Sequence, residues 1–132
     1  MIKKLTILFG AALMLASFML QDNRKAESIQ RGKEIYNQLC IACHQVNGEG
    51  IPGAFPPLAN SDYLFDDITR GIRAVKYGLQ GEIVVNGQTY NSIMTSQQLT
   101  DDETTDVMNY VLNSWGNSHD YISPEQVRAV EQ

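Results

Sequence analysis

The sequence predicts a small all-α domain with one short β-hairpin, and three observations lead to this prediction. Apolar residues recur at helical spacing in several segments of the 132-residue chain. Helix-start signals precede two of these segments, at Thr100-Asp101-Asp102-Glu103 and Ser123-Pro124-Glu125-Gln126. The strongest hairpin signal is Asn86-Gly87, which lies between two short β-prone runs. A chain of this length is expected to form one domain.

Residues 1–21 differ from the rest and are typical of a secretory signal peptide. Lys3 and Lys4 precede an uncharged apolar run from Leu5 to Leu20. This run is shorter than the about twenty residues that a spanning helix needs. No clean small-x-small cleavage triplet ends it, so an uncleaved N-terminal membrane anchor is the alternative. The segment contains no cysteine, so we expect no lipid anchor. In either case we expect residues 22–132 to be exported to the periplasm.

The exported body is acidic. Removal of Lys3 and Lys4 with the signal peptide leaves 8 basic and 15 acidic side chains, a formal net charge of −7. Such a domain binds neither nucleic acid nor an anionic membrane surface by charge. We expect its charge to steer it toward a basic patch on a protein partner, with solubility alone as the other interpretation.

The first helix of the body is expected from Ser28, a residue that can cap it, to about Leu39. Gly32 lies on its apolar side. An interior glycine costs about 1 kcal/mol relative to alanine, so its presence indicates a close approach to another helix.

The later elements follow in order. A short helix begins at residue 61 or 62, and a second is capped by residue 66 or 67 and ends near residues 78–81. The hairpin is expected at residues 82–90. The helix opened by Thr100 runs to about Trp115, with Met108 among its inward residues. A short helical tail then begins at Pro124.

The two cysteines of the body lie in Cys40-Ile41-Ala42-Cys43-His44. In an exported protein, this C-x-x-C-H motif predicts covalent attachment of haem, with both thiols bound to one porphyrin and His44 as the proximal iron ligand. A zinc site would lack a suitably spaced fourth ligand, because His119 is far away in the chain. A thioredoxin-like pair would need a strand–helix unit. A simple disulfide would leave His44 unexplained.

Residues 48–53 match the G-x-G-x-x-G dinucleotide fingerprint. That motif requires a preceding strand and a helix that opens within it. Here three prolines follow between residues 52 and 57, and no strand precedes. We therefore expect a loop.

The sixth iron ligand decides between an electron carrier and a ligand-binding haem protein. The candidates in the body are Met94, Met108 and His119. Met108 suits core packing and His119 follows the end of a helix. Met94 lies in a loop about fifty residues beyond the attachment motif, but methionine is also a common core residue. Position alone leaves this choice open.

Taken together, these pieces resemble the class I cytochrome c family over nearly the whole mature chain, most closely its small bacterial periplasmic members. The resemblance rests on an ordered set of motifs: a helix with Gly32 and Tyr36, Cys40–His44, Gly48-x-Gly50, Phe55-Pro56-Pro57-Leu58-Ala59, Tyr90-Asn91-x-x-Met94, and a capped last helix with Tyr110 and Trp115.

The resemblance implies the cytochrome c fold, with crossing first and last helices in contact at Gly32, and one covalent haem c ligated by His44 and Met94. It also implies that the Pro56 carbonyl accepts a hydrogen bond from His44. Leu58 and Tyr90 are expected to line the haem pocket, and the apolar pattern adds Phe55, Ile72 and Val75. Thr95 is a departure, because many relatives have proline after the methionine.

We therefore expect a single-electron carrier between periplasmic or membrane redox proteins, and not an enzyme. It would act alone or as the cytochrome subunit of a dehydrogenase, reductase or oxidase. If Met94 is not a ligand, the alternative is a five-coordinate haem enzyme or a sensor of gas or peroxide.

Overall fold

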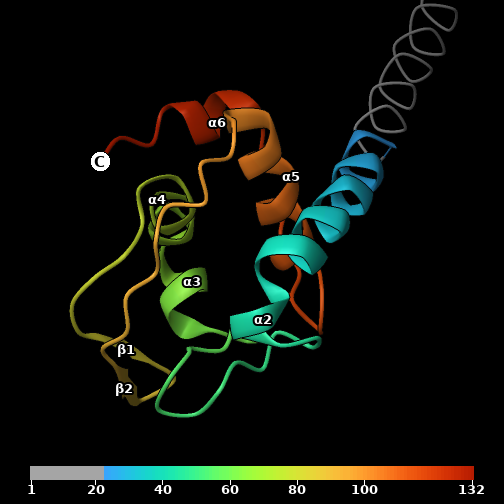
Figure 1. Cartoon of the computed structure of the whole chain (residues 1–132). Coiled ribbons are helices and arrows are strands. Elements are labelled where there is room, and N and C mark those ends of the chain that lie inside the picture. Colours follow the sequence, from blue (N-terminus) through green and yellow to red (C-terminus); the bar gives the residue numbers. More distant parts are fainter. Residues whose placement is uncertain (1–22) are drawn as a thin grey trace, which may run out of the picture.

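The computed structural model describes residues 23–132, so the expected signal peptide at residues 1–21 lies outside the described residues. The described chain is mainly helical, with one two-stranded antiparallel sheet (Figure 1). Residues 23–39 are helical and precede α2 (Ile41–His44), α3 (Asp62–Asp66), α4 (Ile68–Tyr77), β1 (Ile83–Val85), β2 (Gln88–Tyr90), α5 (Asp101–Val111) and α6 (Pro124–Arg128). The predicted all-α fold with a small hairpin is confirmed. Between residues 23 and 132, no helix has the length and apolarity needed to cross a membrane.

The helix at residues 23–39 crosses α5 in close contact at Gly32. A Cβ atom added to Gly32 would collide with the backbone carbonyl of Asp106 and lie 2.9 Å from Cβ of Tyr110. Only glycine allows the two backbones to approach this closely. The helix–helix contact expected from an interior glycine is thus confirmed.

Three aromatic rings fill the interior beside this crossing. Tyr36 is fully buried, and its ring centroid lies 5.3 Å from that of Tyr110 and 5.0 Å from that of Trp115. The rings are tilted or edge-to-face, which are the favourable arrangements for aromatic pairs. The Trp115 indole N–H donates to the Val46 carbonyl, which fixes the segment after α5 against the loop after His44.

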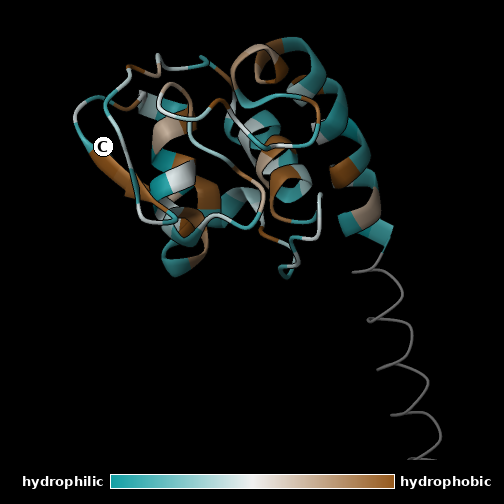
Figure 2. Ribbon diagram, turned by 90° about the horizontal axis from the view of Figure 1, so that it is seen from below, coloured by the Kyte–Doolittle hydropathy of each residue, from teal (hydrophilic) through white to brown (hydrophobic). Residues whose placement is uncertain are grey.

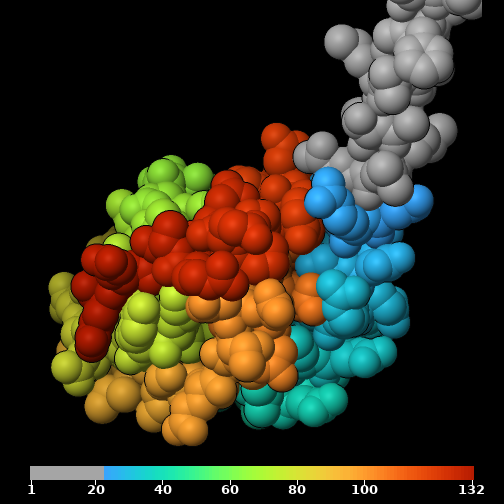
Figure 3. Space-filling model, turned by 90° about the horizontal axis from the view of Figure 1, so that it is seen from above, coloured from blue at the N-terminus to red at the C-terminus, as the bar shows by residue number. Residues whose placement is uncertain are grey.

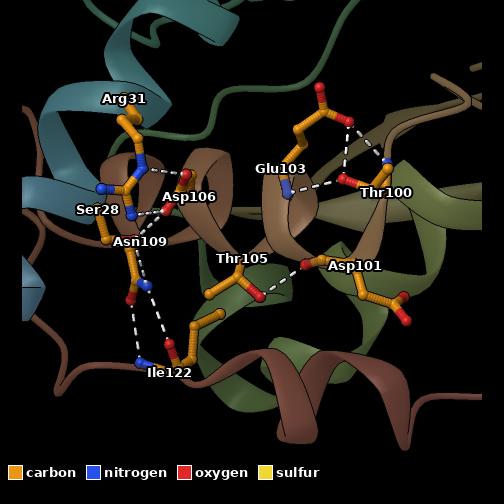
Figure 4. A network of polar contacts seen from close by, with 9 residues as sticks. All are labelled: Ser28, Arg31, Thr100, Asp101, Glu103, Thr105, Asp106, Asn109 and Ile122. Carbon is orange, nitrogen blue, oxygen red and sulfur yellow. Dashed lines mark hydrogen bonds and ion pairs between the residues drawn. The ribbon is translucent and has the colours of Figure 1, made fainter.

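Ser28 does not cap the first helix, contrary to the prediction, because the helix already includes residues 23–27. Its buried hydroxyl donates instead to Asp106 in α5, at 2.7 Å, and accepts a hydrogen bond from Asn109. Arg31 adds two hydrogen bonds to the Asp106 carboxylate (Figure 4). Ser28, which the local pattern predicted as a helix cap, therefore forms a polar contact between the two helices instead.

The other helix starts follow the predicted caps. Ser61, Asp67, Thr100 and Ser123 each accept a hydrogen bond from a backbone N–H in the first turn of α3, α4, α5 and α6. α5, however, ends at Val111 and not near Trp115. The side chains of the two residues after Leu112 explain the early end, because Asn113 and Ser114 donate to carbonyls of the last turn.

The hairpin turns at Asn86 and Gly87, both with positive φ, as the predicted tight turn requires. Val85 and Tyr90 are buried, whereas Val84, the residue before Val85 in β1, faces solvent. The Asn86 side chain accepts a hydrogen bond from Asp62 at the start of α3. The hairpin thus stands beside α3, with its buried residues turned to the interior. Figure 2 shows hydrophobic residues concentrated on one strand and on individual helix turns.

Candidate functional site

Cys40, Cys43 and His44 lie on one helical turn. The backbone N–H groups of Cys43 and His44 both donate to the Cys40 carbonyl, and Cys40 N–H donates to Tyr36 at the end of the preceding helix. Residues four apart in a helix share a face, so Cys40 and His44 point to the same side. Both line one cavity, and Cys43 lines the cavity next to it.

His44 is buried and is oriented by the loop that follows it. Its Nδ1 lies 3.0 Å from the Pro56 carbonyl, the contact that the family resemblance implied. Since that oxygen only accepts, Nδ1 carries the proton, and Nε2 of the neutral ring keeps a lone pair for a metal. Burial lowers the pKa of His44, although the Pro56 hydrogen bond opposes this. The net lowering favours the neutral imidazole, and the Pro56 hydrogen bond orients it.

The loop that carries Pro56 is fixed by its own hydrogen bonds. Gly50 N–H donates to the His44 carbonyl, and Leu58 N–H donates to the Gly48 carbonyl at 2.7 Å. This segment is a loop, as predicted for the glycine-rich stretch at residues 48–53, and no helix opens within it. The loop therefore serves to place Pro56 beside the imidazole.

Two adjoining cavities lie in front of His44. They enclose about 670 and 460 Å³ of empty space, part of it open to solvent, and are lined mostly by apolar side chains. Five residues line both cavities, so the two are lobes of one cleft: His44, Pro56, Leu79, Ile83 and Met94.

Met94 reaches the same cleft as His44 from a distant part of the chain. Its loop is held by a two-residue bridge, in which Met94 and Leu79 each donate a backbone hydrogen bond to the other at 2.8 Å. Met108 is a core residue, as expected, but it also lines the larger lobe. His119 lines neither lobe. Of the three candidate ligands, Met94 alone lines both lobes together with His44.

The remaining pocket predictions divide between the lobes. Leu58 and Val75 line the larger lobe, and Phe55 and Tyr90 line the smaller one. Ile72 lines neither lobe and belongs to the packed core, because the inward face of α4 splits between core and cleft. Sequence reasoning missed Gly71, Leu79 and Ile83. Gly71 could have been predicted to line the cleft, because it lies one helical turn from Val75. No feature of the sequence indicated that Leu79 pairs with Met94.

The Cys40 thiol does not have the lowered pKa of a reactive thiol. Burial, with a smaller contribution from Cys43, raises the pKa of Cys40 to about 11. Reactive thiols need a lowered pKa, because the thiolate is the nucleophile. No disulfide joins the two cysteines, and no group of three or more His, Cys, Asp or Glu side chains within residues 23–132 could hold a metal ion.

These donors fit a haem. An apolar cleft suits the porphyrin ring, which carries little polarity on its faces. The two thiols, the imidazole with a free nitrogen and the Met94 thioether are the groups that haem attachment and ligation use. Among residues 23–132, those that line the two lobes include no Asp, Glu, Lys or Arg.

Comparison with known proteins agrees with this site. The family model described as "Cytochrome c" matches residues 29–115. The chain is 47% identical over 92 residues to "Cytochrome c-552" of Thermus thermophilus, covering 66% of this chain and 70% of that protein. It is 32% identical over 91 residues to "Alcohol dehydrogenase (quinone), cytochrome c subunit" of Gluconobacter oxydans, covering 66% of this chain but only 19% of that subunit.

Proposed function

Since the chain belongs to the cytochrome c family, whose members carry covalent haem c and transport electrons, we propose that it carries one electron at a time on a single haem c attached to Cys40 and Cys43, with His44 and Met94 as axial ligands. One observation supports this proposal above the others. His44 and Met94, fifty residues apart, line both lobes of the same apolar cleft.

Each residue of the site has a defined task in this proposal. The thioethers of Cys40 and Cys43 hold the porphyrin against the helical turn. The Pro56 carbonyl keeps the proton on Nδ1 of His44, which leaves Nε2 for the iron and makes it a stronger donor. Met94 occupies the sixth position and so keeps small exogenous ligands away.

The bound haem supplies the one-electron couple, and the chain tunes it. Methionine–histidine ligation raises the reduction potential. The apolar walls, among them Leu58, Ile83 and Tyr90, have the same effect because they disfavour the additional positive charge of the oxidised state. The chain contributes binding, orientation and electrostatics, and no bond-making chemistry.

The partner that we propose is another redox protein with a basic docking patch. Neither residues 34–69 nor residues 77–127, which supply most of the cleft, contain a lysine or arginine. The smaller lobe reaches the surface at Ile93, which is 72% exposed and next to Met94. Arg73 of α4 borders this region, because it lines a surface pocket with Ile93 and Met94. A brief complex at this largely apolar surface would let electrons leave through the haem edge. A dehydrogenase of the kind named for the Gluconobacter relative is one candidate.

We propose that the domain is exported to the periplasm and works there. The apolar segment that follows Lys3 and Lys4 supports this location, and covalent haem attachment suits it. Retention of that segment as an anchor would leave the domain on the same side of the membrane.

The ligation is tested by the absorption spectrum of the ferric, haem-loaded protein. We expect the weak red-region band that marks His/Met iron in this family, and we expect Met94→Ala to abolish it and to lower the reduction potential by on the order of 100 mV. Met108→Leu, which keeps the apolar volume in the core, is the control and should keep the band. An unmodified protein that lacks the band and binds cyanide or carbon monoxide readily would instead support the five-coordinate alternative.

A further inference from the structure

The last turn of α4 lies directly against the loop that carries Met94. The two hydrogen bonds between Met94 and Leu79 join the loop to the residues just after this helix. Ser96 adds a hydrogen bond from its hydroxyl to the Lys76 carbonyl at 2.6 Å. A Cβ atom on Gly78 would lie only 2.7 Å from the Met94 carbonyl, so the two backbones are in close contact. The position of Met94 is therefore set by the end of α4.

The same turn of α4 is held on another side by the C-terminal tail, residues 117–132. The Lys76 ammonium donates to the carbonyls of Val127 at 3.0 Å and Val130 at 3.1 Å. The Tyr77 hydroxyl also donates to the Val130 carbonyl, at 3.1 Å. These carbonyls are at the end of α6, where a cation is favourable. Figure 3 shows the tail, in red, lying across the α4 region.

The Lys76 ammonium also links this contact to α5. It lies 3.1 Å from the Asp101 carboxylate, and the Lys76 side chain is only 12% exposed. Arg128 of α6 lies 3.4 Å from the same carboxylate. Lys76 thus has three partners for its three donors, and it joins α4, the start of α5 and the end of α6 in one polar contact.

The tail is firmly anchored along its length, so it can restrain what it touches. Asn117 donates to the carbonyls of Leu58 and Val111. Ile122 exchanges two backbone hydrogen bonds with the Asn109 side chain (Figure 4). Val127 is fully buried. The tail is therefore part of the packed structure from its start to Val130.

We propose that Lys76 and Tyr77 are positioning residues, through which the C-terminal tail fixes the end of α4 and with it the Met94 loop. The tail lies beyond residues 29–115, the part matched by the family model, so this restraint is additional to the shared fold. The inference rests on the proposed function, in which Met94 is the sixth ligand. It assigns the tail a role in keeping Met94 in place, and not only in general stability.

Imidazole binding to the ferric, haem-loaded protein tests this role, because imidazole must displace Met94 to bind. We expect the imidazole affinity to rise about threefold in Tyr77→Phe, which loses one hydrogen bond, and about tenfold in Lys76→Met, which loses three. Arg31→Met is the matched control, because it also removes a cation from an α5 carboxylate, but from Asp106, which bonds to residues 23–39 and not to α4. Its affinity should stay within about twofold of that of the unmodified protein.

The outcomes separate the positioning role from the ligation itself. If Met94→Ala raises imidazole affinity but Lys76→Met and Tyr77→Phe change it no more than Arg31→Met does, the tail only stabilises the fold and the inference is wrong. If Met94→Ala changes neither the red-region band nor imidazole affinity, Met94 is not the ligand, and the proposed ligation and this inference are both wrong. Tyr77→Phe keeps the test valid should Lys76→Met fail to fold.

Discussion

The two sides of this molecule are built in different ways. The helix-crossing side, made of residues 23–39, α5 and the C-terminal tail, is packed solid around Tyr36, Leu112 and Ile122, which are almost fully buried. The cleft side, made of residues 40–64 and 79–94 together with one face of α4 and of α5, surrounds about 670 Å³ of empty space, part of it open to solvent. Protein atoms alone complete the first side, whereas the second side needs the group that it binds.

This difference identifies the source of stability on each side. Packed side chains and buried hydrogen bonds hold the helix-crossing side at native density. The walls of the cleft are held mainly by backbone hydrogen bonds within single loops and between short segments, such as the pair between Leu79 and Met94. Apolar walls that face a cavity lose the contacts that a bound ring would give them. Binding of a covalent cofactor should therefore contribute a large share of the folding free energy.

The largest effect is expected when the haem is absent. The double variant Cys40→Ser/Cys43→Ser cannot attach it. Because the lost contacts rival the about 5–15 kcal/mol by which domains are stable, we expect this variant to lose cooperative thermal unfolding, measured by circular dichroism. A cooperative transition at the temperature seen for the haem-loaded protein would show that the cleft side is complete without the cofactor.

The second-largest loss of stability is expected where a new side chain would collide with the backbone on the helix-crossing side. We expect Gly32→Ala to lower the free energy of unfolding by about 3 kcal/mol, because the new Cβ meets the backbone of Asp106. Gly71→Ala is the matched control in α4, where the nearest atoms are the side-chain ends of Leu64 and Met108. Urea denaturation measures both. Equal losses in the two variants would mean that the cleft side is as tightly packed as the crossing.

Removal of a buried polar side chain should lower the free energy of unfolding slightly less than Gly32→Ala does. Asn109 is fully buried, and Asn109→Ala would leave the backbone N–H and carbonyl of Ile122 without partners. We expect a loss of about 2 kcal/mol in urea denaturation. A loss within about 0.5 kcal/mol, as for an ordinary surface substitution, would contradict a stabilising role for this contact.

The smallest effect concerns pH. Hydrogen bonds from the Thr100 backbone N–H and hydroxyl hold the pKa of Glu103 below its ordinary value of 4.5. Its folded-state pKa is depressed, so its contribution to stability is present above pH 4.5 and is lost as the pH falls below that value. Glu103→Gln should therefore differ from the unmodified protein at pH 7 and converge with it near pH 3, as measured by urea midpoints. A constant difference across this range would contradict the assignment.

The sequence carried the local features well because each had a short-range cause. The caps at Ser61, Thr100 and Ser123 and the turn at Asn86-Gly87 depend on neighbouring residues only. The close approach at Gly32 could be predicted because an interior glycine needs a reason. For the cleft, the order of the motifs indicated which segments meet, and His44 and Met94 do line the same space.

Other features depended on contacts between distant segments. Ser28 has the side chain of a cap, yet it bonds to Asp106 across the helix crossing. Helical periodicity placed Met108 in the core but could not show that it also borders the cleft. The link from Val130 through Lys76 and Leu79 to Met94 joins three segments that have no shared motif. Only the assembled fold shows such relations.

The central claim is that one haem is bound covalently to Cys40 and Cys43 with its iron on His44. Intact mass of denatured, exported protein, measured beside a haem stain and a thiol assay, tests this most directly. The account predicts a mass equal to the polypeptide plus one haem, retained colour after denaturation and no free thiol. A colourless polypeptide mass, with both thiols free or joined to each other, would contradict it.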